Sequence, residues 1–502
     1  MSGSLNPSSL TRLLGEWNLG AAPAYRELAD VVRLLVLDGR VPLHVALPSE
    51  RALAATLGIS RTTVTAAYAL LREQGFLSSG QGSRGRTCIP QSGPPGNGGG
   101  GGADLSGAPG LAVPDGILDL AYASLPASGE VVHRAFASAL TELPALLPGF
   151  GYDALGVNPL REAIARHYSA AGVPTTARQI LVTSGAQHAL NIVLRTLTSW
   201  SDKVLVEHPS YPNALDAIRA AGCRLVPVAM PAAHPHPRSG ASGVRPGWDL
   251  EAIETALRQQ RPAMAYMVPD FHNPTGRLMP DSQRRRLVRA AAAAGTVLLV
   301  DETLRELNLD GVASAPLAAF SPAVVSIGSL SKSHWAGLRT GWIRAEEPLI
   351  QRFAAARTTM DLGGPVVEQL AAAHLVNALA EPLPARLASL RDNRDALLEL
   401  IAGRLPGWQS ERPDGGLSVW CRLPAPISTA LAVVAPDFGI RLAAGPRFGT
   451  GGAFERYLRV PFTLPPGHLE TAVAALRSAQ DKLEASPQLR RSLGAPPAAA
   501  IA

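Results

Sequence analysis

Residues 324–342 read Val-Val-Ser-Ile-Gly-Ser-Leu-Ser-Lys-Ser-His-Trp-Ala-Gly-Leu-Arg-Thr-Gly-Trp. The apolar, β-branched run at 324–327 predicts a buried strand, and Lys332 follows it in the next turn. The chain has only three lysines against 43 arginines. A guanidinium stays protonated near neutral pH, whereas an unprotonated ε-amine can form an imine with an aldehyde. Lys332 is therefore a candidate nucleophile, although an isolated lysine is more often a solvated surface charge.

Hydroxyl and guanidinium groups flank this lysine in the sequence. Ser329 and Ser331 precede it, and Arg339 follows seven residues later. Serine and arginine side chains suit a phosphate, because a hydroxyl donates one hydrogen bond and a guanidinium can donate two in parallel. The pattern favours an imine-forming lysine beside a bound phosphate group.

Length and composition indicate a globular protein of two or more domains. Of the 502 residues, 46% are hydrophobic and 17% are charged, and the net charge of +6 permits a nucleic-acid partner without requiring one. Cys88, Cys223 and Cys421 show no paired or metal-ligand spacing, so we expect a reduced compartment and no metal site. The N-terminus lacks a signal-peptide pattern, and the longest apolar stretch, 290–300, is too short to span a bilayer. We expect a cytoplasmic protein with no membrane contact.

A break in composition divides the chain. Residues 91–116 contain ten glycines and four prolines, which is typical of a flexible linker. The predicted boundaries are an N-terminal segment 1–20, a first domain 21–90, the linker 91–116, a large domain 117–384, a small C-terminal subdomain 385–485 and a disordered tail 486–502.

The part that follows the linker alternates short apolar runs with Ala- and Leu-rich helices. This alternation predicts an α/β layer with a mostly parallel sheet, followed from about residue 385 by a smaller α+β subdomain. The strand candidates are Ile180–Thr183, Val204–Glu207, Leu225–Val228, Met264–Val268, Val297–Val300 and Val324–Ile327.

The part that precedes the linker has three helical patterns and a hairpin pattern. One helix is predicted over Tyr25–Leu37, and two more are predicted to start at the caps Ser49 and Ser60 with a glycine-containing turn between them. Gly75-Phe76-Leu77 and Gly80–Thr87 together predict a β-hairpin wing. Over residues 24–88 this order resembles the winged helix-turn-helix of GntR-type bacterial regulators, which bind double-stranded operator DNA.

The first turn of the third helix is the part that we expect to meet DNA. Backbone N–H groups and the helix dipole attract phosphate there, and short hydroxyls with an arginine can reach base edges. By position, the resemblance implies DNA contacts from Arg51, Ser60, Arg61, Thr62, Thr63 and Thr65, with Gln81 and Gly82 at the wing tip. The structural alternative is that Ser60 only caps its helix and Arg51 only pairs with an acid.

The lysine string resembles the Schiff-base lysine motif of fold-type I aminotransferases, which bind pyridoxal 5′-phosphate (PLP). Other segments match that family in the same order, so the resemblance implies PLP as cofactor. The implied cofactor contacts are Lys332, Asp301, Asn273, Tyr211, Ser184, Gly185, Ala186, Gln187, Ser329, Ser331 and Arg339, with Tyr152 reaching the phosphate of a neighbouring subunit. Arg459 matches the arginine that receives a substrate carboxylate. Taken singly, each segment could be only a turn, a helix cap or a loop.

Three of these residues would hold the pyridine ring. In the pattern of the family, Asp301 pairs with the ring nitrogen, Asn273 binds the ring hydroxyl and Tyr211 stacks on the ring. One departure concerns the tyrosine that family members usually carry two or three residues after the aspartate, because this chain has Thr303 and Leu304 there. Threonine is shorter and leaves Asn273 as the main partner of the ring oxygen, so efficient transamination is not expected.

A GntR-type winged helix joined by a linker to an aminotransferase-like domain is the architecture of the MocR subfamily of bacterial transcription regulators. The resemblance covers nearly the whole chain and implies a homodimer, usually head-to-tail. Our hypothesis is a PLP-binding transcription regulator that senses PLP or an amino-acid-like carboxylate, with at most partial transamination. Two alternatives stay open: an active aminotransferase with an accessory DNA-binding domain, and a PLP-independent repressor with an inactive second domain.

Overall fold

The computed structural model describes residues 5–15, 17–18, 23–37, 41, 45–78, 85–87, 117–231 and 247–486. The predicted linker 91–116, the wing-tip residues Gln81 and Gly82, Cys88 and the tail after residue 486 lie outside these ranges. The chain divides into two compact units. One contains the residues up to Asp119 together with 426–442 and those from Ala474 onward, and the other contains Leu120–Ala425 and Ala443–Val473.

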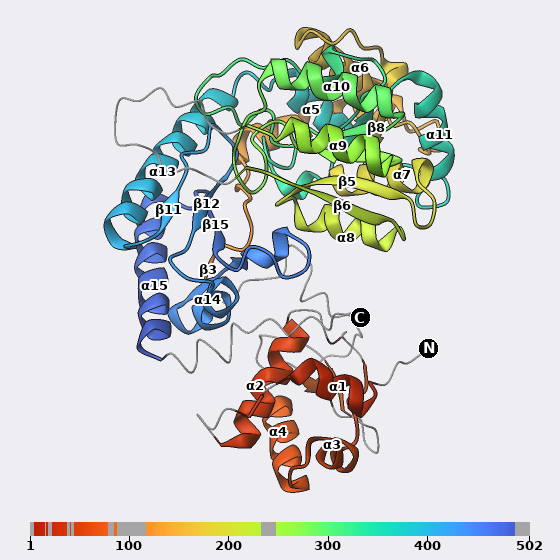
Figure 1. Ribbon diagram of the computed structural model, residues 1–502. Coiled ribbons are helices and arrows are strands. Elements are labelled where there is room, and N and C mark those ends of the chain that lie inside the picture. Colours follow the sequence, from red (N-terminus) through yellow and green to blue (C-terminus); the bar gives the residue numbers. More distant parts are fainter. Residues whose placement is uncertain are drawn as a thin grey trace. The chain divides into compact units, whose positions relative to one another are not determined.

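The N-terminal helices form a winged helix-turn-helix (Figure 1). Both predicted caps are confirmed, since Ser49 Oγ accepts a hydrogen bond from the Ala52 amide at 3.3 Å and Ser60 Oγ accepts one from the Thr63 amide at 3.1 Å. Such an oxygen satisfies an N–H group that the helix itself leaves unpaired. The elements are α1 (Pro7–Leu14), α2 (Ala24–Leu37), α3 (Glu50–Leu57), α4 (Arg61–Glu73), β1 (Leu77–Ser78) and β2 (Arg86–Thr87), and β1 pairs antiparallel with β2.

The apolar faces of these helices share one core. Leu28, Val32 and Leu71 are buried in it, as the helical spacing of apolar residues predicts. Leu10 and Leu14 of α1 are buried in the same core. Residues before position 21 therefore stabilise the winged helix-turn-helix.

Seven strands form one large sheet in the order β4-β10-β9-β8-β7-β5-β6. Neighbouring strands are parallel except where β10 pairs with β4 and β9, so the predicted mostly parallel α/β sheet is confirmed. The strands are β4 (Ile180–Thr183), β5 (Lys203–His208), β6 (Arg224–Ala229), β7 (Met264–Met267), β8 (Val297–Asp301), β9 (Val325–Ser329) and β10 (Gly341–Arg344).

Helices cover both faces of this sheet (Figure 1). Because side chains alternate along a strand, Leu298 and Val300 of β8 lie in one core and Leu299 lies in the other. The first core is closed by α5 (Gly129–Glu142), α6 (Asn158–Ala170), α9 (Leu250–Gln260), α10 (Asp281–Ala294) and α12 (Val366–Asn377). The second core is closed by α7 (Ala186–Leu197), α8 (Pro212–Ala220) and α11 (Glu347–Arg357).

A smaller antiparallel sheet has the order β11-β12-β15-β14, and α13 (Leu383–Arg404) packs against β12. Its strands are β11 (Gln409–Ser410), β12 (Ser418–Arg422), β14 (Ala443–Ala444) and β15 (Tyr457–Pro461). The remaining elements are β3 (Leu118–Asp119), which pairs with β13 (Ile440–Arg441), the helices α14 (Ser428–Val434) and α15 (Pro466–Ala485), and the 3₁₀ helices η1 (Leu143–Ala145), η2 (Ala177–Gln179), η3 (Leu317–Ala319), η4 (Ala336–Leu338), η5 (Ala435–Phe438) and η6 (Gly445–Phe448).

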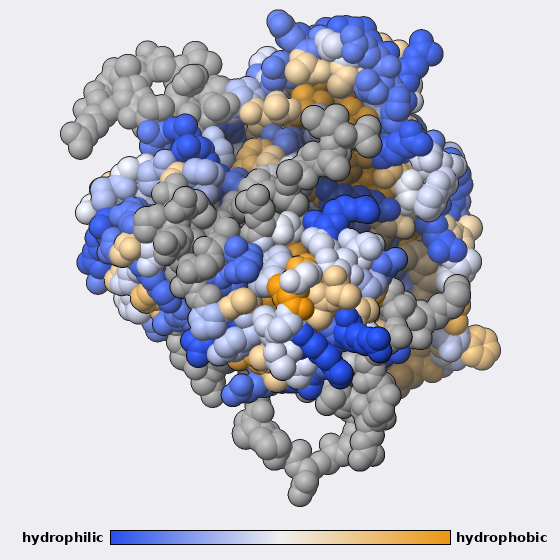
Figure 2. Space-filling view, turned by 60° about the horizontal axis from the view of Figure 1, so that its bottom comes forward, coloured by the Kyte–Doolittle hydropathy of each residue, from blue (hydrophilic) through white to orange (hydrophobic). Residues whose placement is uncertain are grey.

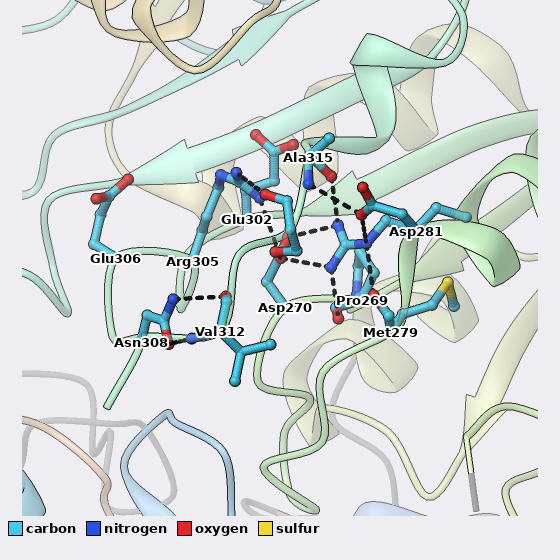
Figure 3. A network of polar contacts seen from close by, with 12 residues as sticks. Pro269, Asp270, Met279, Asp281, Glu302, Arg305, Glu306, Asn308, Val312 and Ala315 are labelled. Carbon is cyan, nitrogen blue, oxygen red and sulfur yellow. Dashed lines mark hydrogen bonds and ion pairs between the residues drawn. The ribbon is translucent and has the colours of Figure 1, made fainter. Parts of the chain in front are cut away.

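A buried ion-pair network holds the loop that follows β8. Arg284 of α10 is fully buried, and its guanidinium donates to Asp270 Oδ1 at 2.7 Å. Arg305, from the loop, donates to the same oxygen at 3.2 Å (Figure 3). Arg284 also donates to three backbone carbonyls around it. A buried charge without a partner is costly, so Arg284 and Asp270 stabilise each other in the folded protein. Arg305 joins this pair from the loop and thereby ties the loop to the body of the domain.

On the face shown in Figure 2, hydrophilic residues lie in several separate areas, with hydrophobic residues between them. Cys223 and Cys421 are buried and form no disulfide. Among the described residues, no helix is both long and apolar enough to cross a membrane.

Candidate functional sites

Lys332 lies in the turn after β9 and is partly buried. Its Nζ donates a hydrogen bond to the Ala123 carbonyl at 2.7 Å. Burial, together with the positive charges of Arg459 and Arg339, lowers the pKa of Lys332 to about 8 against the opposing charge of Asp301. A larger share of the amine is therefore unprotonated near neutral pH, which nucleophilic attack on an aldehyde requires.

Asp301 ends β8, and its carboxylate is buried. Oδ2 accepts a hydrogen bond from the Tyr266 hydroxyl at 2.8 Å, and Oδ1 accepts one from the Thr303 amide at 3.0 Å. Burial raises the pKa of Asp301, although the hydrogen bonds from Thr303 and Tyr266 and the charge of Lys332 act in the opposite direction. A carboxylate held in this way can pair with a protonated nitrogen.

The chain turns from β4 into α7 at Ser184 and Gly185. Gly185 has a φ of 95°, and a Cβ there would lie 2.8 Å from Arg339 Nη2. Arg339 in turn donates to the Ser184 carbonyl at 3.0 Å. Ala186 and Gln187 open the first turn of α7, where backbone amides attract phosphate. Gln187 Oε1 is buried and has no hydrogen-bond partner among the described residues.

The two serines before the lysine fix its turn. Ser329 is buried, and its Oγ donates to the Thr340 carbonyl at 3.0 Å and accepts from the Ser331 amide at 3.1 Å. These bonds hold the end of β9 and the start of β10 together around Lys332. The Ser329 hydroxyl therefore acts on the backbone in this structure.

Tyr211 and Asn273 follow the neighbouring parallel strands β5 and β7. The Tyr211 hydroxyl accepts a hydrogen bond from Asn213 Nδ2 at 3.0 Å. Burial, with a smaller effect from the charge of Asp301, raises the pKa of Tyr211 to about 12. The carboxyl ends of parallel strands meet at one edge of a sheet, which places both residues at the edge that also carries Asp301.

Arg459 lies in β15 and is buried. Its guanidinium donates to the Ala121 carbonyl, and its Cζ lies 5.1 Å from the centre of the Phe448 ring. Ala121 and Ala123, which accept from Arg459 and Lys332, are two residues apart in one segment. The structure therefore brings the predicted lysine and the predicted carboxylate-binding arginine to one site.

Tyr152 is a surface residue of the single chain. It is 75% exposed, and Phe150 nearby in the sequence is 99% exposed. Both lie in the segment between η1 and α6. The predicted contact of Tyr152 with the phosphate of a second subunit stays a prediction.

Sequence reasoning missed several buried polar residues next to the site. Besides Tyr266, these are Glu207 and His272, whose Oε2 and Nε2 atoms lie 3.4 Å apart. His272 directly precedes Asn273, and its Nδ1 lies 2.9 Å from Thr275 Oγ1. The signal available in the sequence was a polar residue inside an apolar strand or at its end, because such residues are seldom buried without a partner.

The arrangement fits PLP. The cofactor needs an amine that loses its proton readily, a carboxylate for its ring nitrogen and a helix start for its phosphate. Lys332, Asp301 and the turn at Gly185 supply these three groups. Glycine is required at position 185, because the φ is 95° and a Cβ there would lie 2.8 Å from Arg339 Nη2, the guanidinium assigned to the phosphate.

The predicted DNA-contacting residues lie on the surface of the winged helix-turn-helix. Arg51, Ser60 and Thr62 are exposed, and Thr63 is half-buried. Ser60 Oγ lies 2.7 Å from Thr62 Oγ1 and 2.8 Å from Thr63 Oγ1. The first turn of α4 therefore presents a cluster of hydroxyls at the positive end of the helix dipole.

Glu50, the first residue of α3, contacts the side chains of α4. Its carboxylate accepts from Thr65 Oγ1 at 2.8 Å, and lies 3.8 Å from Arg61 Nε and 3.6 Å from Arg72 Nη2. The side chain of Arg61 is still 71% exposed. The Glu50 carboxylate thus holds Thr65 and limits the directions that Arg61 can take.

The fold and the lysine site define a PLP-dependent, fold-type I protein that also carries a winged helix-turn-helix. Residues 151–476 match the family of class I and II aminotransferases, and the chain belongs to that family. Residues 24–85 match the bacterial regulatory proteins of the gntR family. The two domains in this order are those of the MocR subfamily of transcription regulators.

Relatives of both kinds are similar to the chain. It is 30% identical to 2-aminoadipate transaminase of Thermus thermophilus, over 61% of this chain and 75% of that protein. It is 26% identical to the uncharacterized HTH-type transcriptional regulator YisV of Bacillus subtilis, over 79% of this chain and 84% of that protein. Among solved structures it resembles the α-aminoadipate aminotransferase LysN of Thermus thermophilus, complexed with N-(5′-phosphopyridoxyl)-L-leucine, with a TM-score of 0.66 and 30% identity over 74% of this chain and 94% of that one. PLP is thus the cofactor that the family and the site define.

Proposed function

We propose that this chain is a transcriptional regulator that binds operator DNA through its winged helix and senses PLP together with an amino-acid-like carboxylate. The observation that carries the proposal is the combination, in one chain, of an exposed and capped helix start at Ser60 with a lysine, Lys332, whose pKa is about 8. An enzyme needs only the second feature. Its site of action would be the cytoplasm, where operator DNA lies.

In this proposal the site residues bind and orient the ligands. When bound, PLP supplies an aldehyde and an electron-withdrawing pyridine ring. Lys332 would hold the aldehyde through its amine, Asp301 would keep a proton on the ring nitrogen, and Arg459 would bind the effector carboxylate through paired hydrogen bonds. The phosphate is assigned to Ser184, Gly185, Ala186, Gln187, Ser331 and Arg339, and the ring to Asn273 and Tyr211. Ser329 is assigned to the phosphate as well, and its hydroxyl would have to give up the Thr340 carbonyl to donate there.

Sensing requires that the ligand bind two arrangements of the protein with different affinities. Thr303 favours a sensing role over catalytic turnover, because its side chain is too short to replace a tyrosine at the ring oxygen. Its backbone amide donates a hydrogen bond to Asp301. An effector that stays bound without rapid conversion is suited to a regulator.

An active aminotransferase is the second candidate, and the similarity to 2-aminoadipate transaminase favours it. The two functions differ in turnover. Sustained conversion of an amino acid and a keto acid by the purified protein would support the enzyme, whereas a single round of conversion at most would support the regulator.

Retardation of DNA tests the regulator. The full-length protein should retard the intergenic DNA next to its own gene, and PLP with amino acids should change the apparent Kd. Arg61→Gln should weaken binding and reduce its salt dependence. Arg26→Gln, which removes an exposed arginine of α2, is the matched control and should have little effect. A Lys332→Ala protein that binds this DNA as tightly as the wild type, with no response to PLP in either protein, would instead support a PLP-independent repressor.

We also propose a homodimer, in which a second copy covers the exposed apolar side chains that precede Tyr152 in the sequence. Leu140, Leu147 and Phe150 are 58%, 66% and 99% exposed, and a monomer seldom leaves such a group in water. A two-fold axis through this region would place Tyr152 of each copy against the surface of the other copy. Phe150→Asp should shift the sedimentation coefficient toward that of a monomer, and an unchanged dimer would argue against this surface.

A further inference from the structure

Tyr266 is a buried tyrosine to which the functions above give no part. It lies in β7, one strand away from Asp301 in the large sheet, and is fully buried. In the register of the two strands, Tyr266 is opposite Leu299, two residues before Asp301. Residues two apart on a strand point to the same face, so Asp301 and Tyr266 both face the core that α7 and α8 close.

The contact between these residues is short and directional. The Tyr266 hydroxyl donates to Asp301 Oδ2 at 2.8 Å, while the Thr303 amide donates to Oδ1 at 3.0 Å. Both carboxylate oxygens are therefore held, one by the backbone of the following turn and one by a side chain of the neighbouring strand. The Asp301 carboxylate has little freedom to rotate.

The ionisation of both groups suits this role. Burial, with the charge of Asp301 next to it, raises the pKa of Tyr266 well above its usual value, so the phenol stays a donor. Donors to a carboxylate favour its charged form, which offsets part of the burial that raises the pKa of Asp301. Tyr266 thereby supports the ionised carboxylate that a pyridinium nitrogen requires.

We infer that Tyr266 is a positioning residue of the cofactor site, whose hydroxyl fixes and stabilises the Asp301 carboxylate that receives the ring nitrogen of PLP. This inference rests on the proposed role of Asp301. The tyrosine acts from β7 and on the carboxylate, and not from the turn after β8, where this chain has Thr303 and Leu304.

Replacement of one hydroxyl tests the inference. In Tyr266→Phe, the Asp301 carboxylate loses a hydrogen-bond donor and becomes a stronger base than in the wild type. The proton between Asp301 and the ring nitrogen of PLP should therefore shift toward Asp301. We expect PLP to bind about tenfold more weakly, the loss typical of one hydrogen bond to a charged group. We also expect the pH midpoint of the visible absorption band of the bound cofactor to move to higher pH. Tyr266→Met, which also removes the hydroxyl, should give the same direction.

The chain offers a matched control on the opposite face of the sheet. Tyr168 is also buried and donates to a buried carboxylate, Glu302 Oε2, at 2.6 Å. Glu302 follows Asp301 directly, but Tyr168 belongs to the other core. Tyr168→Phe should lower the melting temperature without moving the pH midpoint of the band.

Three outcomes would overturn the role of Tyr266, and they can be told apart. A wild type that binds no PLP would overturn both the proposed function and the role of Tyr266. A wild type that binds PLP, with Tyr266→Phe and Tyr266→Met unchanged in affinity and midpoint, would overturn the role of Tyr266 alone. Equal shifts of the midpoint in Tyr266→Phe and Tyr168→Phe would reduce Tyr266 to a packing residue.

Discussion

The pKa of Lys332 sets the pH at which the protein can attach an aldehyde. An amine attacks only when it is unprotonated. With a pKa of about 8, about one quarter of the Lys332 amine is unprotonated at about pH 7.5, compared with about one in a thousand for a lysine at its ordinary value of 10.5. Attachment near neutral pH should therefore be about two hundredfold faster than at an ordinary lysine.

Reconstitution of the cofactor-free protein measures this difference. The rate at which the visible band appears after addition of PLP should rise with pH and level off above about pH 8. The charge of Arg459 contributes to the low pKa of Lys332, so Arg459→Gln should move the midpoint of this profile to higher pH. Arg456→Gln removes an exposed arginine of the same segment and should leave it in place. A midpoint near 10 in the wild type, or equal shifts in both variants, would refute the reasoning.

Three further predictions concern stability and the two binding surfaces. Arg284→Leu leaves the buried Asp270 carboxylate with fewer partners and should lower the free energy of unfolding by about 3–5 kcal/mol in urea denaturation; a loss under about 1 kcal/mol would contradict a structural role for the pair. Ser60→Ala removes a helix cap worth about 1 kcal/mol and should speed amide exchange in the first turn of α4, so unchanged exchange would show that the cap is dispensable. Gly185→Ala combines a φ of 95° with a close contact to a guanidinium and should weaken PLP binding, whereas Gly295→Ala, at a φ of 68° with nothing within 4 Å, should not; equal effects would refute the steric argument.

The large sheet could be predicted from the sequence because each strand is a short apolar run between helical patterns. Residues 180–183 coincide with β4, and the other five predicted runs overlap β5, β6, β7, β8 and β9. The strand β10 was missed. Its residues, Gly341–Arg344, read Gly-Trp-Ile-Arg and form no apolar run. Its antiparallel place between β4 and β9 depends on contacts that no local pattern encodes.

The residues of the candidate site also differ in whether the sequence can indicate them. Lys332, Asp301 and the Gly185 turn each sit in a local motif at a strand end, so the sequence could indicate them. Tyr266 could not be found in this way, since it lies 35 residues before Asp301 and meets it only through the order of β7 and β8. The apolar run that contains Tyr266 predicts nothing beyond a buried strand.

The two neighbouring acidic residues at the end of β8 show that the site depends on the register of that strand. Asp301 turns toward the α7 side and Glu302 toward the α6 side, each with its own tyrosine. A deletion of one residue in β8 would bring Glu302 to the place of Asp301, because a shift by one position turns every side chain of a strand to the other face. The longer glutamate would then face the cofactor, and the aspartate would turn to the opposite face of the sheet. An alignment of related chains should therefore match the partner tyrosine on the adjoining strand, and not merely the presence of an acidic residue, before the cofactor role is transferred.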